Sequence, residues 1–170
     1  MLKLAALARA GEAVVDSIGS VTAWSSLAIV LVMAFNVLLR YAFNTGSVAM
    51  QELEWHLMAP IALLGMSYAI LKDGHVRIDV VYARMSWRYQ ETVNAISHLL
   101  VLTFAAIMVL LSVPYVEQSF SIGEISPDPG GLTHRYLLKS MIPIGFILLG
   151  LQALSAMLRA ILKLVAPHAD

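Results

Sequence analysis

The sequence has 170 residues, of which 59% are hydrophobic and only 13% are charged. Soluble domains carry roughly 25% charged residues, so this composition excludes an ordinary soluble protein and indicates a small integral membrane protein. Eleven basic residues balance eleven acidic ones, so no net charge favours a nucleic-acid partner, and the absence of cysteine excludes disulfides and thiolate metal sites.

Four segments without Asp, Glu, Lys or Arg predict membrane-spanning helices. They are residues 17–39, 55–71, 92–116 and 140–158. Each falls in the range of roughly 17–25 helical residues that crosses a bilayer core. We therefore expect a single all-α domain of four transmembrane helices, at about 17–40, 51–72, 92–116 and 138–160. Residues 1–16 are expected to form an amphipathic helix on the membrane surface rather than a signal peptide.

The distribution of lysine and arginine predicts that both termini are cytoplasmic. With the N-terminus inside, the inner segments hold eight basic residues and the outer segments hold three. The inner residues are Lys3, Arg9, Lys72, Arg77, Arg84, Arg88, Arg159 and Lys163. The outer residues are Arg40, Arg135 and Lys139.

Polar, small and aromatic residues in or beside the predicted helices indicate where contacts form. Asn36 lies four residues before Arg40, where a hydrogen bond near the helix end is expected. Ala62, Gly65 and Ala69 share one face of the second helix. Small residues let helices approach closely, and here the partner is either this bundle or another subunit. Trp24, Trp55 and Trp87 are expected to be interfacial anchors.

The two long links differ in character. Apolar residues in the inner link recur at helical spacing, while three arginines gather on another face, so we expect an in-plane helix at about 76–90 on the inner surface. The outer link 117–139 contains Pro127, Pro129, Gly130 and Gly131, which exclude a continued helix. A loop of this length either makes a contact or connects passively.

No catalytic, substrate-binding or metal site can be assembled, so neither an enzyme nor a cofactor is expected. Haem would need His56 and His98 as paired ligands, but the topology places them near opposite faces of the membrane. A proton-coupled drug exporter would need an acid within its first helix, and residues 17–39 hold none. Glu52 and Glu54 face different sides of a helix and are interpreted as interface residues.

The chain also resembles a known family, the small membrane subunit of tripartite ATP-independent periplasmic (TRAP) transporters. The resemblance rests on Asn36–Asn44, on the Glu52–Leu53 pair, on Gly65–Ser86 and on Ser126–Phe146. Its most specific part is His75–Arg77–Asp79, and the sequence departs from the family pattern in VAMQELEW at 48–55.

The resemblance implies a scaffold role in the bacterial inner membrane. In such systems a periplasmic substrate-binding protein captures an organic acid, and a large multi-helix subunit transports it with sodium by an elevator motion. The small subunit would brace the large one. Candidate partner-interface residues are Arg40, Glu52, His75, Arg77, Asp79 and Arg135, for which headgroup contact is the alternative. A membrane anchor of a redox complex and a free-standing four-helix carrier remain as alternative functions.

Overall fold

The structure, a computed structural model, describes residues 2–74 and 82–165. These residues form four α-helices and no strand: α1 (Leu2–Phe43), α2 (Val48–Leu71), α4 (Trp87–Ser121) and α5 (Arg135–Val165). Each helix is long and apolar enough to cross a membrane. The expected all-α fold with four candidate spans is therefore confirmed.

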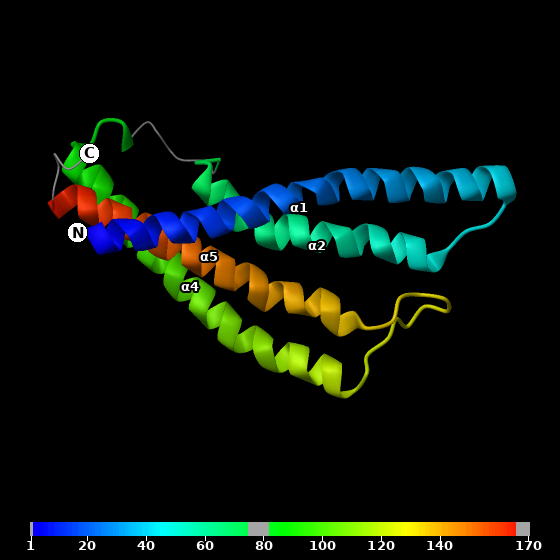
Figure 1. Ribbon diagram of the computed structural model, residues 1–170. Helices are drawn as coiled ribbons and strands as arrows, with labels where there is room; N and C mark the ends of the chain where they lie inside the picture. The colour runs from blue at the N-terminus through cyan, green and yellow to red at the C-terminus, as the bar shows by residue number, and fades with distance from the viewer. Residues whose placement is uncertain (1, 75–81, 166–170) are drawn as a thin grey trace.

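The helices run alternately in opposite directions, so that the start of α1 and the end of α5 lie at one end of the molecule (Figure 1). We call this the inner end, following the orientation expected from the basic residues. The outer end holds the short link 44–47 and the loop 122–134. Toward the outer end the α4–α5 pair diverges from α1, while the loop 122–134 reaches back toward the start of α2 (Figure 1).

Helix α5 lies at the centre of the packing, because it contacts each of the other three helices. Its apolar residues Phe146 and Leu149 are buried together with Ala105 of α4. Close backbone approach at glycines tightens the bundle: a Cβ on Gly145 of α5 would lie 2.8 Å from Leu63 of α2. On the other side of the bundle, Gly11 of α1 packs against Ser155 of α5.

The helices extend beyond the expected bounds, most of all at the inner end. Helix α1 begins at Leu2 and includes the segment expected as a separate surface helix, so that its 42 residues span about 63 Å. That is about twice the thickness of a bilayer core. Three ion pairs join helices beyond the apolar segments at the inner end, so the bundle continues past these segments. The pairs are Asp16–Lys72 at 2.6 Å, Glu91–Lys163 at 3.2 Å and Glu12–Arg159.

The expected in-plane helix at about 76–90 does not run through to residue 90. Residues 75–81 lie outside the described residues, Tyr82–Met85 form a turn, and Ser86 is the extended N-cap of α4. The turn is bonded back onto α4, since the Gln90 side chain donates to the carbonyls of Tyr82 (3.0 Å) and Met85 (3.1 Å). The amphipathic pattern at 87–90 therefore belongs to the first turn of a long helix.

Candidate interaction surfaces

A buried carboxylate at the outer end joins α2 to the loop 122–134. Ser47 caps α2 by accepting a hydrogen bond from the Met50 backbone N–H (3.3 Å), which sets the start of the helix and turns Glu52 inward. Glu52 is only 3% exposed. Its carboxylate accepts hydrogen bonds from the Ser126 hydroxyl and from the Leu132 backbone N–H, the latter at 2.5 Å.

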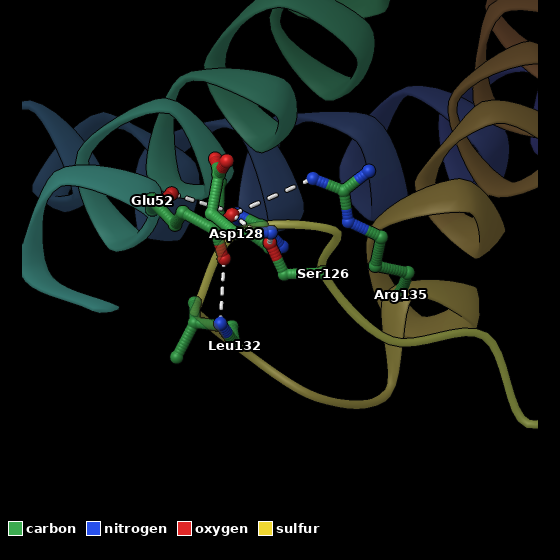
Figure 2. A network of polar contacts seen from close by, with 6 residues as sticks. Glu52, Ser126, Asp128, Leu132 and Arg135 are labelled. Carbon is green, nitrogen blue, oxygen red and sulfur yellow. Dashed lines mark hydrogen bonds and ion pairs between the residues drawn. The ribbon is translucent and has the colours of Figure 1, made fainter. Parts of the chain in front are cut away.

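Arg135, the first residue of α5, completes this group, which we call the Glu52 cluster (Glu52, Ser126, Leu132 and Arg135). One guanidinium nitrogen lies 3.6 Å from a Glu52 oxygen (Figure 2). The same guanidinium lies over the Trp55 ring, 5.3 Å from its centroid. Burying a charge is costly unless it is paired and hydrogen-bonded, and here two hydrogen-bond donors and one guanidinium converge on one carboxylate.

The loop is folded tightly around this carboxylate. The Ser126 N–H donates to the Leu132 carbonyl (3.1 Å), and the Gly131 N–H donates to the Asp128 carbonyl (3.0 Å). A Cβ on Gly131 would lie 2.8 Å from a Glu52 oxygen, so glycine is needed for the close approach. Gly130 has φ +79°, a conformation that glycine adopts without strain.

A second ion pair supports the base of the loop. Glu124 pairs with Lys139 of α5, and the Lys139 ammonium lies over the Tyr115 ring of α4. The hydrogen bond from Lys139 is the main reason that the pKa of the Glu124 carboxyl is lowered. The Arg135 N–H also donates to the Glu124 carbonyl (3.2 Å), so that α4, the loop and α5 are tied together.

Asn36 and Glu54 form a polar contact between α1 and α2. The Asn36 side chain is buried, and its amide nitrogen donates to a Glu54 oxygen at 3.2 Å. The bond expected near the end of the first helix is therefore a bond between helices instead. Glu52 and Glu54 do face different directions, as their spacing predicts: one contacts the loop and the other contacts α1.

One face of α2 is mostly exposed in the part of the chain that the structure describes, although the Arg135 guanidinium lies over its Trp55 ring. It carries a run of residues spaced by four and three, the period of close helix pairs. Ala62 and Ala69 are exposed, and a Cβ on Gly65 would meet nothing within 4 Å. These three small residues therefore make no close helix contact within residues 2–74 and 82–165. We call the face the α2 seam: Gln51, Trp55, Met58, Ala62, Gly65 and Ala69.

The other residues singled out in the sequence are scattered. Arg40 is exposed in the last turn of α1, and His75, Arg77 and Asp79 lie outside the described residues. Of the candidate partner-interface residues, the structure brings together Glu52 and Arg135. The tryptophans expected as anchors are exposed: Trp24 72%, Trp55 41% and Trp87 45%.

Of the two histidines considered for haem, His56 lies in α2 and His98 lies in α4. His56 Nδ1 lies 2.6 Å from the Glu52 carbonyl oxygen of its own helix. Within residues 2–74 and 82–165, no group of three or more His, Asp or Glu side chains is placed to hold a metal ion.

Sequence reasoning missed Ser126 and Leu132, which lie 74 and 80 positions from Glu52. One signal could have indicated the cluster. The expected topology places the starts of the second and fourth helices at the same end, so the acid Glu52 and the base Arg135 were candidates for pairing.

Comparison with known families agrees with this architecture. The comparison with curated proteins finds no match. The model of the family described as "Tripartite ATP-independent periplasmic transporters, DctQ component" matches residues 29–163, which run from α1 to the last turn of α5. The chain therefore belongs to the DctQ component family of TRAP transporters, a family of transporter components rather than of enzymes.

Proposed function

We propose that this chain is the scaffold subunit of a TRAP transporter in the bacterial inner membrane, with both termini cytoplasmic. It braces a large multi-helix membrane subunit during sodium-coupled uptake of an organic acid delivered by a periplasmic binding protein. Family membership supports the assembly with other TRAP components. The excess of basic residues in the inner segments supports the orientation.

The α2 seam is the observation that carries the proposal. In lipid there is no hydrophobic driving force between helices, so association depends on close packing, which small residues permit. The seam places Ala62, Gly65 and Ala69 in one row that faces away from the other described helices. A helix of the large subunit packed along this row would approach α2 closely.

Polar contacts between the helices at both ends of the bundle support a bracing role. Elevator transport needs one part of the assembly to stay fixed while another part slides. Three ion pairs join the helices at the inner end, and the Glu52 cluster joins α2, the loop and α5 at the outer end. A subunit held at both ends resists the sliding of one helix past another.

The test compares enlarged side chains on two exposed faces. Gly65→Leu places four carbon atoms on the α2 seam, whereas Ala106→Leu enlarges an exposed position of α4 by three. Both variants stay apolar, so insertion into the membrane is unaffected. We expect Gly65→Leu to reduce co-purification with the large subunit at least tenfold, and Ala106→Leu to leave it unchanged, because only the first blocks close approach.

Proteoliposomes then test the function itself. We expect uptake of the organic acid only when this chain, the large subunit, the binding protein and a sodium gradient are all present. Uptake by this chain alone would contradict the scaffold role. Loss of co-purification in Ala106→Leu but not in Gly65→Leu would move the interface from α2 to α4.

A further inference from the structure

The Glu52 cluster determines the conformation of the loop 122–134. A single carboxylate on α2 receives a side-chain donor from position 126, a backbone donor from position 132 and the charge of Arg135 just beyond the loop. Figure 2 shows these groups converging on Glu52 from the loop and from α5. The loop therefore takes its shape from a residue that lies outside it in the sequence.

This arrangement leaves little freedom to the loop. The Glu52 carboxylate is 3% exposed, so a donor that moved away would leave a buried charge without its partner. Gly131 lies so near the carboxylate that a Cβ there would be 2.8 Å from it. The backbone bonds of Ser126 and Gly131 close the loop on both sides of its tip, Pro127–Gly130.

The surface that this loop presents has a defined chemistry. The tip is exposed, and the apolar side chains of Ile122 (66% exposed) and Ile125 (62%) lie beside it in the sequence. Asp128, at the tip, is an exposed acid whose side chain has no partner among the described residues. The nearby cations are instead paired within the chain: Arg135 with Glu52, and Lys139 with Glu124.

An apolar surface with an unpaired acid at its tip fits a protein that offers a basic side chain there. Lipid headgroups are a poorer fit, because their phosphates would face the Asp128 carboxylate. On the outer side of the membrane, the partner that must approach this subunit in every transport cycle is the substrate-loaded binding protein. This step rests on the proposed function and on its orientation.

We propose that Glu52 is a positioning residue for transport. It fixes the loop 122–134 in the conformation against which the substrate-loaded binding protein docks. Glu52 does not touch the binding protein; it acts through Ser126, Leu132 and Arg135.

The experiment measures initial uptake by the reconstituted transporter as the concentration of loaded binding protein is varied. Glu52→Gln keeps the size of the side chain but removes the charge that faces Arg135 and places an amide among hydrogen-bond donors. We expect the KM for the binding protein to rise about tenfold, while the maximal rate stays within about twofold. Glu54→Gln is the matched control, since Glu54 bonds to Asn36 and not to the loop, and its KM should be unchanged.

Two further variants apply if Glu52→Gln impairs assembly. Ser126→Ala removes one donor and keeps the carboxylate, and Asp128→Lys reverses a charge at the exposed tip while keeping the backbone bond of Asp128 to Ser126. We expect both to raise the KM with normal co-purification. Hydrogen exchange in the loop should be faster in Glu52→Gln than in Glu54→Gln.

If Glu52→Gln assembles and its KM for the binding protein is unchanged, the proposal is overturned. If Glu52→Gln does not assemble, an unchanged KM in both further variants overturns it. So does an equal rise in Glu54→Gln. Failure of the wild-type chain to assemble or to support uptake would be a different result, because it would refute the proposed function rather than the role of Glu52.

Discussion

Replacing Gly145 by alanine places a methyl group against the backbone of α2. The new Cβ would lie 2.8 Å from both the Cβ and the carbonyl oxygen of Leu63, and 3.0 Å from its carbonyl carbon. Carbon atoms pack best at about 3.5–4.0 Å, so the two helices must separate locally by about 0.7–1.2 Å. A gap of about 0.5–1 Å removes a quarter to a half of the dispersion energy of the atoms concerned. We expect a loss of about 1–3 kcal/mol in the free energy of unfolding, as in overpacked cores.

Gly65→Ala is the control for this prediction, because the same substitution on α2 meets nothing within 4 Å. Both variants gain the same helix propensity, so the difference between them isolates the contact with Leu63. The measurement is reversible unfolding of the purified chain in detergent, followed by circular dichroism. Equal stability of the two variants would refute the close approach of α2 and α5 at Gly145.

Two further outcomes are expected. The hydrogen bond to Asp16 raises the pKa of Lys72 above its ordinary value of 10.5. The pair therefore stabilises the fold fully at pH values below the pKa of Lys72 in the unfolded state. This stabilisation is lost as the pH rises through the raised pKa of the folded state. Asp16→Asn should therefore lower the melting temperature in detergent near neutral pH, and the difference from wild type should vanish at alkaline pH; a difference independent of pH would contradict the pairing. Asn36→Ala should cost about 0.6–1.7 kcal/mol by removing a hydrogen bond between helices. A double-mutant cycle with Glu54→Gln checks this value, and strictly additive effects would show that the bond contributes nothing.

The four spans could be predicted because the membrane imposes a rule that the sequence shows directly. An apolar run of about 20 residues that crosses the bilayer does so as a helix, since this satisfies every backbone polar group within the run. The predicted runs 17–39 and 140–158 lie within α1 and α5. The fold class follows from this rule alone and needs no knowledge of how the helices pack.

The helix ends were harder to predict, because charge was interpreted as marking the end of a helix. At the inner end six of the charged residues are paired between helices instead. Asp16 contacts Lys72 and Glu12 contacts Arg159, so the segment before Ser17 continues α1 and packs against α5. Which charges pair across helices depends on packing, which the pattern along one helix does not contain.

The direction in which a helix face points could not be predicted either, because it also depends on packing. The spacing of Ala62, Gly65 and Ala69 predicts one row of small residues, and the row exists, but the spacing does not say whether it faces the bundle. The close contacts inside the chain occur at other glycines, such as Gly19, which packs against Tyr68. The contacts of Glu52 could not be predicted for a similar reason, because its partners Ser126 and Leu132 lie 74 and 80 positions away in a loop.

Three of the four described helices contain a proline in their interior, and α1 contains none. Pro60, Pro114 and Pro143 lack an N–H, so the carbonyl one turn before each is left without its usual donor. Bending therefore costs least at these points in α2, α4 and α5, whereas α1 is hydrogen-bonded over its whole length. A force applied at the outer end would accordingly bend α2, α4 and α5 more easily than α1, which would be the stiffest helix of the subunit.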